Sequence, residues 1–369
     1  MEKFIPVAVP NFIGNEKKYV DDCIDTTWIS SVGKYVTEFE SSFADYMNVS
    51  DAIACCNGTV ALHVPLLALG LQPGDEVILP SLTYIATANC VKYCGATPVF
   101  ADCLPDTWNI DPADIERKIT PKTKGIMPVH LYGNPCDMDA IMAIAKKHNL
   151  FVLEDAAECH GALYNGKKVG SIGDAAAFSF FGNKIITTGE GGMIITNNKE
   201  LADHMRILKG QGQDPNRRYW FIEVGYNYRM TNVAAAIGLA QLEKIDTHIA
   251  NRKKVASWYM EELEDAKDYI QFQKVTDNAE SVWWMFSILL KEKVKHTRDE
   301  VMAMLKEDGI ETRPLFYPMH EMPVYKDDNA NCPVCERVAA RGMNLPTHAL
   351  LTREDVTYIC NKLKEHIMG

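Results

Sequence analysis

The sequence lacks any uninterrupted apolar run near the ~18 to 20 residues that a membrane-spanning helix needs. Its first residues, Met1 to Pro6, contain no apolar core of a signal peptide. Internal repeats, low-complexity tracts and flexible linkers are also missing from the sequence. We therefore expect a folded protein of the cytoplasm.

A surplus of basic residues is missing as well. The 38 Lys and Arg residues are outnumbered by 49 Asp and Glu residues, which gives a formal net charge of -11. This balance excludes a broad nucleic-acid-binding surface, which needs clustered basic side chains. A small anionic ligand needs only a few local donors, and the candidates are Arg217, Arg218, Arg229 and Arg313. With 369 residues, 47% hydrophobic and 24% charged, the chain has the composition of an ordinary soluble enzyme.

A disulfide pattern is not evident, although the chain has 11 cysteines. Their number is odd and most of them lie within apolar segments, so we expect buried thiols. The one close pair, Cys332 and Cys335, could bind zinc or change redox state if a second Cys or His pair lay at ligand spacing. None follows, so we expect this pair to lie in a loop without a metal. Bound zinc in the purified protein would instead indicate a metal or redox module.

Short apolar runs alternate with longer helical patterns from about residue 50 to 200. This alternation is typical of βαβ units and predicts an α/β fold with a mainly parallel sheet. Two further strands, 175–180 and 192–196, are separated by a turn that contains Lys184, and we expect them to be neighbours that close one side of the sheet. The other predicted strands span 51–56, 76–79, 98–102, 125–130 and 150–154.

The last third of the chain predicts a smaller α/β domain. A helix from Thr231 to about residue 266, with Thr231 as its cap, is expected to join the two domains. We predict a large domain of residues 1–245 and a small domain of residues 246–369. The elements expected in the small domain are a strand at 282–290, a helix at 298–307, a Pro-rich stretch at 313–323 and a terminal helix from Arg353.

Three features of the large domain carry chemistry. Asn57, Gly58 and Thr59 follow a predicted strand and open a helix, where free amides and the helix dipole favour a phosphate, although most such turns bind nothing. Asp155 ends the strand 150–154, where it could hold a metal, an arginine or a cationic ring nitrogen. Lys184 lies where burial would lower its pKa and make it an amine nucleophile, unless it is a solvated loop lysine. Together these are the parts that a pyridoxal phosphate site requires.

Four longer motifs give these features a family context. The sequence resembles the DegT/DnrJ/StrS family of sugar aminotransferases over nearly the whole chain. The resemblance implies an aspartate-aminotransferase-like fold, known as fold type I of pyridoxal phosphate enzymes. The motifs that carry the resemblance lie at 154–162, 170–174, 178–184 and 188–192.

The resemblance also implies roles for single residues. Lys184 is expected to bind the cofactor covalently and then to move protons, and Asp155 to pair with the pyridine nitrogen. Tyr84 is expected to stack on the cofactor ring, with a core tyrosine as the alternative, and Glu158 to lie beside the cofactor. His160 is expected to be a packed histidine. Phosphate contacts are implied for Gly58, Thr59 and Ser179, and for Asn227 from the neighbouring subunit of a homodimer, whose pairing into a tetramer stays open.

The implied reaction transfers an amino group from L-glutamate to a nucleotide-linked 4-keto-6-deoxy sugar. GDP-4-keto-6-deoxy-D-mannose is the expected acceptor, giving GDP-perosamine for a surface polysaccharide such as O-antigen. A UDP- or dTDP-linked acceptor is the alternative, followed by a sugar dehydratase, in which histidine replaces Lys184, and by a regulator without turnover. The candidate sugar- or nucleotide-facing residues are Trp28, Ser30, Tyr219, Trp220, Arg313, Tyr317 and His320.

Overall fold

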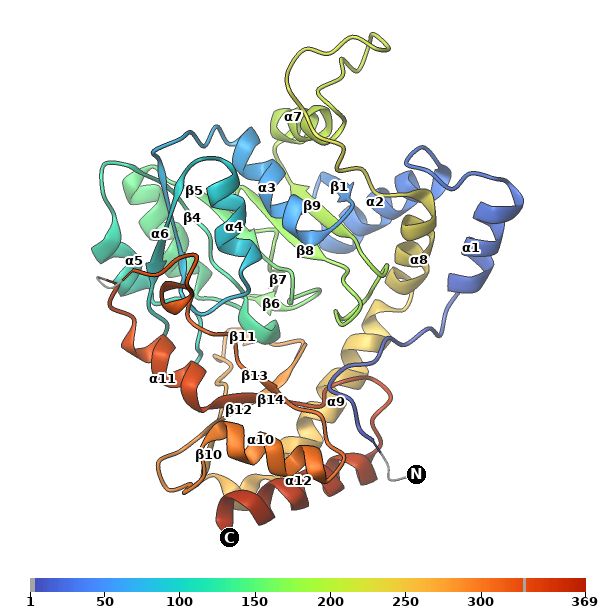
Figure 1. Ribbon diagram of the computed structural model, residues 1–369. Helices are drawn as coiled ribbons and strands as arrows, with labels where there is room; N and C mark the ends of the chain where they lie inside the picture. The colour runs from blue at the N-terminus through green and yellow to red at the C-terminus, as the bar shows by residue number, and fades with distance from the viewer. Residues whose placement is uncertain (1–3, 328–329) are drawn as a thin grey trace.

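The structure is a computed structural model that describes residues 4–327 and 330–369. Its centre is a seven-stranded sheet in the order β1-β9-β8-β5-β4-β2-β3 (Figure 1). Only β9 runs against the other strands of this sheet, which confirms the predicted α/β fold with a mostly parallel mixed sheet. The strands are β1 (Asp51–Cys55), β2 (Glu76–Pro80), β3 (Thr97–Ala101), β4 (Thr123–Ile126), β5 (Phe151–Asp155), β8 (Ala175–Ser179) and β9 (Gly192–Thr196).

The edge of this sheet differs from the prediction in one respect. β8 and β9 are neighbours, as expected, but they do not close the side of the sheet, because β1 lies outside β9. All five residues of β1 are buried, so its sequence reads like that of an inner strand. Hydrophobic periodicity identifies a strand but gives no information about the strand beside it.

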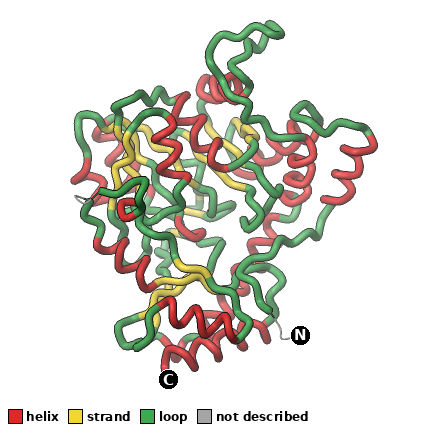
Figure 2. Tube along the Cα trace, viewed as in Figure 1, coloured by secondary structure: helices red, strands yellow, loops and turns green. Residues whose placement is uncertain are grey.

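Helices cover both faces of the large sheet (Figure 2). Alternate side chains of each strand therefore enter two different cores: Ala176 and Phe178 pack in one, and Ala175 and Ala177 in the other. No helix in the described part of the chain is long and apolar enough to cross a membrane. The helices of this region are α1 (Glu16–Asp25), α2 (Lys34–Met47), α3 (Gly58–Ala68), α4 (Ala86–Tyr93), α5 (Pro112–Lys118), α6 (Met138–His148) and α7 (Lys199–Lys209), with the 3-10 turn η1 (Leu131–Gly133).

The long joining helix is divided in two. Thr231 caps it as predicted, since its side chain accepts a bond from the Ala234 amide, but α8 (Asn232–Leu242) ends before α9 (Ile245–Glu262) begins. Glu243, at the break, accepts bonds from Asn15 and Tyr19 of the N-terminal segment. The break thus lies at a tertiary contact that helical periodicity cannot reveal.

A second, antiparallel sheet of order β10-β12-β14-β13 follows α9. The helices at 298–307 and from Arg353 are confirmed, and both begin with a capping box. The strand expected at 282–290 covers only 286–290, because Trp283 has a positive φ of 51°. A short sheet of β6 (Leu163–Tyr164), β7 (Lys167–Lys168) and β11 (Ala279–Glu280) also forms. The other elements are β10 (Ile270–Phe272), β12 (Phe286–Leu290), β13 (Arg313–Pro314), β14 (Gly342–Leu345), α10 (Arg298–Glu307), α11 (Pro333–Arg341), α12 (Arg353–Met368), η2 (Glu264–Ala266) and η3 (Met319–Glu321). We propose to keep the domain boundary at residue 245, since the second sheet is formed by later residues.

The Cys332 and Cys335 pair does not lie in a loop, contrary to expectation. Cys332 directly precedes α11 without a side-chain cap bond and Cys335 lies inside the helix, both buried. The amides of Val334 and Cys335 donate to the Asp102 carboxylate at 3.1 and 2.8 Å, so an acid far away in sequence satisfies the helix start. Cys103 adds a sulfur near Cys335 and Asp102, yet both Asp102 oxygens are already bonded to backbone amides.

Candidate active site

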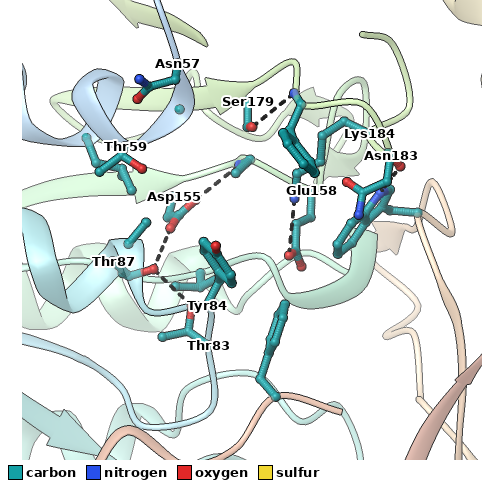
Figure 3. A pocket seen from close by; sticks show the side chains of 18 of the residues that line it. Asn57, Thr59, Thr83, Tyr84, Thr87, Asp155, Glu158, Ser179, Asn183 and Lys184 are labelled. Carbon is teal, nitrogen blue, oxygen red and sulfur yellow. Dashed lines mark hydrogen bonds and ion pairs between the residues drawn. The ribbon is translucent and has the colours of Figure 1, made fainter. Parts of the chain in front are cut away.

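A cavity of about 670 Å³ opens at the carboxyl ends of the central strands and reaches the second sheet (Figure 3). The large domain contributes the start of α3, the end of β5 and the turn after β8, and the second sheet contributes Arg313 and Asn344. This is the edge at which open α/β sheets bind ligands. The predicted site residues that line the cavity are Gly58, Thr59, Tyr84, Asp155, Glu158, Ser179, Lys184 and Arg313.

Lys184 presents a buried amine to this cavity. Its side chain is 11% exposed, so it is not a solvated loop lysine. Its Nζ lies 3.5 Å from Glu158 Oε1 and 3.8 Å from the ring centroid of Trp284. Burial lowers the pKa of the amine, although Glu158 and Asp155 act in the opposite direction. The arrangement therefore favours a reactive free amine.

Glu158 is the acid nearest to that amine. Its other oxygen accepts a bond from the Tyr132 amide at 2.8 Å. Burial raises the pKa of Glu158 to about 7, with Lys184 opposing the change. Near neutral pH this carboxyl therefore exchanges a proton easily beside the amine.

Asp155 ends β5 at the floor of the cavity, and both its oxygens accept hydrogen bonds. Thr87 Oγ1 donates to one at 2.8 Å and the Ala157 amide to the other at 3.2 Å. Thr83 Oγ1 lies 3.0 Å from Thr87 Oγ1, which extends the chain of hydroxyls (Figure 3). Burial raises the pKa of Asp155, while the Thr87 bond and Lys184 lower it. A buried acid held in this way is suited to pair with a cation.

Glu154 precedes Asp155 and points to the opposite face of the strand, as β-strand alternation requires. It accepts bonds from the amides of Gly170, Ile172 and Gly173, and the buried His130 Nε2 lies 3.0 Å from it. The family motif at 170–174 is thus wrapped around this carboxylate. Sequence reasoning missed His130, whose only signal is its place at the end of a predicted strand.

The start of α3 forms one end of the cavity. The Asn57 side chain accepts the Val60 amide at 3.0 Å, which leaves the first amides of the helix directed outward. A Cβ on Gly58 would lie 2.7 Å from Ser179 Cβ, so only glycine leaves space here. Hydrogen-bond donors and free space are therefore present where a phosphate was predicted.

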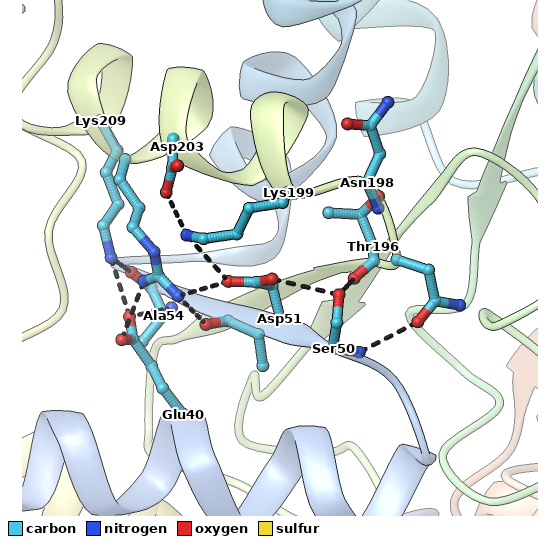
Figure 4. Close-up of polar contacts among 12 residues, drawn as sticks. Glu40, Ser50, Asp51, Ala54, Thr196, Asn198, Lys199, Asp203 and Lys209 are labelled. Carbon is cyan, nitrogen blue, oxygen red and sulfur yellow. Dashed lines mark hydrogen bonds and ion pairs between the residues drawn. The ribbon is translucent and has the colours of Figure 1, made fainter.

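The strand that leads to this helix is fixed along its outer edge (Figure 4). Glu40 of α2 accepts the Ala54 amide at 2.8 Å. From α7, Arg206 donates to the Ala52 carbonyl at 3.0 Å and Lys209 to the Ala54 carbonyl at 2.7 Å. Both cations also bond to Glu40. Side chains thus bond to edge groups of β1 that a further strand would otherwise pair with.

Tyr84 and His160 occupy contrasting positions. Tyr84 is 59% exposed at the cavity, with its ring 5.9 Å from that of Phe316, so it is not a core tyrosine. His160 is fully buried, with ring centroids 5.3 and 5.5 Å from those of Phe178 and Phe180. Burial lowers the pKa of His160 to about 3, so it is neutral and packed.

Several predicted residues do not line the cavity of this chain. Tyr219 and Trp220 lie exposed on the segment that projects beyond α7 in Figure 1, and Asn227 forms a backbone bridge with Gly210. His320 is buried, with Nδ1 2.7 Å from Ser81 Oγ and Nε2 3.2 Å from Glu336. The remaining three, whose roles stay predictions, are Trp28, Ser30 and Tyr317.

The cavity also contains residues that sequence reasoning did not select. Thr87, Trp284 and Asn344 line it. Trp284 belongs to the predicted strand at 282–290, where nothing in the pattern shows which side chain faces a ligand. Asn344 and Arg313 are directly paired between β14 and β13, a register that the sequence does not reveal.

A family model matches residues 11–364, nearly the whole chain. The chain belongs to the DegT/DnrJ/EryC1/StrS aminotransferase family. Two relatives are GDP-perosamine synthases, from Caulobacter vibrioides at 56% identity and from Escherichia coli O157:H7 at 50%, each match covering 98% of both chains. The solved structure of DesI in the presence of its TDP-sugar product is 33% identical, with a TM-score of 0.92 over 99% of this chain and 93% of that one. This DegT/DnrJ/EryC1/StrS member is a pyridoxal-phosphate-dependent sugar aminotransferase.

The residues present fit that cofactor. The space beside Gly58, which a Cβ would fill, joins the amides of α3 to Ser179 as a cradle for the phosphate. Asp155 is a buried acid of the kind that suits a cationic ring nitrogen, and Lys184 is a buried amine of the kind that suits a carbonyl. Tyr84 adds an aromatic ring at the same cavity.

Proposed function

We propose that this chain transfers the amino group of L-glutamate to GDP-4-keto-6-deoxy-D-mannose and so forms GDP-perosamine for a surface polysaccharide. The observation that carries the proposal is the buried Lys184 amine, 3.5 Å from Glu158 in a cavity that also contains Asp155. The identity of 56% with a GDP-perosamine synthase over 98% of both chains supports the GDP-linked acceptor.

Pyridoxal phosphate, when bound, supplies a carbonyl carbon that reacts with amines and a ring that accepts electrons. Lys184 would hold that carbonyl covalently and, once the amino donor has displaced it, its Nζ would move a proton between the substrate carbon and the cofactor. Asp155 is expected to hold a proton on the ring nitrogen by its charge. The amides of Gly58 and Thr59, with Ser179, are expected to bind the phosphate and so fix the position of the ring.

Glu158 is placed to exchange a proton with the Lys184 amine. The Tyr132 amide fixes one oxygen and leaves the other directed at Nζ. Because its pKa is close to neutral, the carboxyl can both release and accept a proton at working pH. It thereby restores the protonation state of the Lys184 amine between the two half-reactions.

We propose that L-glutamate and the nucleotide sugar bind to the same cavity in turn, on the side formed by the second sheet. Arg313 lines this side, and its 41% exposed side chain forms an ion pair with Glu311 at 3.5 Å. A carboxylate or a diphosphate can compete with Glu311 for this guanidinium. The exposed aromatic residues Trp28, Tyr219 and Trp220 are candidates for stacking on the base from a second subunit.

The decisive experiment supplies the purified protein with L-glutamate and a panel of GDP-, UDP- and dTDP-linked 4-keto sugars, and identifies the products by mass. We expect amination of GDP-4-keto-6-deoxy-D-mannose and its loss in Lys184→Ala. Turnover of only a UDP- or dTDP-linked sugar would replace the acceptor but leave transamination intact. Loss of a sugar hydroxyl without amine transfer would indicate a dehydratase. A cofactor absorbance that glutamate does not change would indicate a regulator.

We further propose a homodimer in which Asn227 of each subunit reaches the phosphate of the other. Asn227 lies outside the cavity of its own chain. The segment before it exposes Phe221, Ile222 and Val224, the last with 88% of its surface accessible. An exposed apolar segment of this kind fits burial against a second copy.

A further inference from the structure

Arg252 of α9 places a guanidinium in the protein interior, where the residue is 3% exposed. Burial lowers the pKa of this group to about 10, so it stays charged at neutral pH. Among the described residues, no carboxylate contributes to this pKa. A buried charge without a counter-ion must be held by hydrogen bonds to dipoles.

Three carbonyl oxygens take that role, each from a different segment. Arg252 Nη1 donates to the carbonyl of Trp284 at 2.9 Å and to that of Thr347 at 2.7 Å. Nη2 donates to the carbonyl of Lys184 at 3.4 Å. One side chain of α9 thus bonds to the turn that contains Lys184, to the cavity lining at Trp284 and to Thr347 in the segment after β14.

Two of these segments also contact each other at the amine. The Lys184 amine lies 3.8 Å from the centroid of the Trp284 ring. Trp284 Nε1 donates to the carbonyl of Asn183, the residue before the lysine, at 2.8 Å. Arg252 and Trp284 therefore bond to the backbone at Lys184 and Asn183, and the Trp284 ring lies against the Lys184 amine. We call this set of contacts the frame.

The tryptophan side of this frame is itself held firmly. Trp283 has a φ of 51°, an unfavourable conformation for a bulky residue. A Cβ on Gly133 would lie 2.7 Å from the Trp284 amide nitrogen, so the two backbones are in close contact. Ser281 Oγ donates to the Gly133 carbonyl at 2.9 Å. Such a strained conformation persists only where the surroundings fix it.

We propose that Arg252 is a positioning residue that fixes the Lys184 amine against the Trp284 ring and within reach of Glu158. The inference rests on the proposed function, in which that amine carries the cofactor and moves protons. Without the guanidinium, the carbonyls of Lys184 and Trp284 lose their shared donor and the two segments can separate. A displacement of about 1 Å at a reacting group can lower a rate about 100-fold.

The test compares Arg252→Met and Arg252→Lys with the wild type and with a matched control, Tyr259→Phe. Tyr259 lies on the same helix, is fully buried and donates to the carbonyl of Pro346 at 2.8 Å, next to Thr347. Its substitution removes a comparable buried bond without touching the lysine turn. Three quantities are measured: the rate of the glutamate half-reaction by stopped-flow absorbance, the pH dependence of the bound cofactor's absorbance, and the melting temperature of the cofactor-free protein.

We expect Arg252→Met to slow the half-reaction about 100-fold, with little change in the glutamate concentration that gives half the maximal rate, and to move the midpoint of the absorbance titration. Arg252→Lys should recover part of the rate, because it restores the charge with fewer donors. Tyr259→Phe should lower the melting temperature alone. A wild-type rate and titration in a folded Arg252→Met protein overturns the inference, as does a loss in all three variants that follows their melting temperatures. An inactive wild type, by contrast, contradicts the proposed function itself.

Discussion

At the scale of single residues, Glu158 is the carboxylate that acts most strongly on the pKa of the Lys184 amine. Ionised Glu158 raises the pKa of the amine, while burial lowers it. As the pH rises through about 7, Glu158 ionises and holds more of the amine in its charged form. Glu158→Gln removes this control, so we predict a severalfold faster reaction of cofactor-free protein with pyridoxal phosphate near pH 7. Borohydride trapping across a pH series measures that rate.

Glu190→Gln is the control for this experiment. Glu190 also lines the cavity, but the carboxylates that raise the pKa of Lys184 are Glu158 and Asp155. An unchanged pH profile in Glu158→Gln would show that another group governs the amine.

Asp155 and Asp174 are two acids at opposite ends of β5, and the second serves as a control for the first. Asp155 ends the strand in the cavity, whereas Asp174 accepts the Val152 amide at 2.8 Å, near the start of the strand. Asp155→Asn removes the charge that favours a protonated ring nitrogen, and we predict a loss in kcat of about 100-fold or more. Asp174→Asn should leave kcat nearly unchanged. Steady-state kinetics with glutamate distinguishes the two, and equal losses would assign Asp155 a structural role.

At the scale of elements, the start of α3 depends on one missing side chain. Gly58→Ala would bring a Cβ within 2.7 Å of Ser179 Cβ and 2.9 Å of Ser179 Oγ. Since this fills the proposed phosphate cradle, we predict at least about a tenfold loss of cofactor affinity. Gly182→Ala is the control, because a Cβ there meets nothing within 4 Å and no positive φ is involved. Fluorescence titration of cofactor-free protein measures both affinities, and equal affinities would exclude the cradle.

The outer edge of β1 depends on Glu40. This carboxylate binds the Ala54 amide, Arg206 and Lys209, and it is 16% exposed. Glu40→Ala leaves these partly buried partners unpaired, so we predict a loss of about 2 kcal/mol in the free energy of unfolding. Asp203→Ala breaks an exposed pair with Lys199 and should cost less than about 0.5 kcal/mol. Urea denaturation compares them, and similar values would mean that the edge is fixed in another way.

The sequence predicted most elements and one neighbouring pair of strands, β8 and β9, but not the rest of the strand order. Apolar runs identified the strands at 76–79 and 175–180 because both are buried on two faces. The position of β1 beside β9 could not be predicted, since side-chain periodicity carries no pairing information. The motif at 178–184 indicated Lys184 directly, while Arg252 and Trp284 gave no signal because their roles depend on contacts made across the fold.

At the scale of the whole molecule, the proposed shared sites permit a test with mixed subunits. Lys184→Ala and Asn227→Ala should each be nearly inactive alone. When the two are unfolded and refolded together, half of the dimers are hybrids with one intact site, so we expect about a quarter of the wild-type activity. Native gels confirm that hybrids form. Hybrids without activity would mean that Lys184 and Asn227 serve the same subunit's site or that Asn227 has no role.

The place of β1 has a consequence for synthesis on the ribosome. The proposed phosphate cradle at Gly58 follows β1, the edge strand of the described sheet. β1 pairs with β9 from Asp51 with Thr196 to Cys55 with Gly192, and Cys55 also forms a bridge with Arg229. During synthesis, β1 must therefore remain unpaired until β9 has emerged from the ribosome. The proposed site for pyridoxal phosphate can therefore form only after the chain between β1 and β9 has closed into a loop.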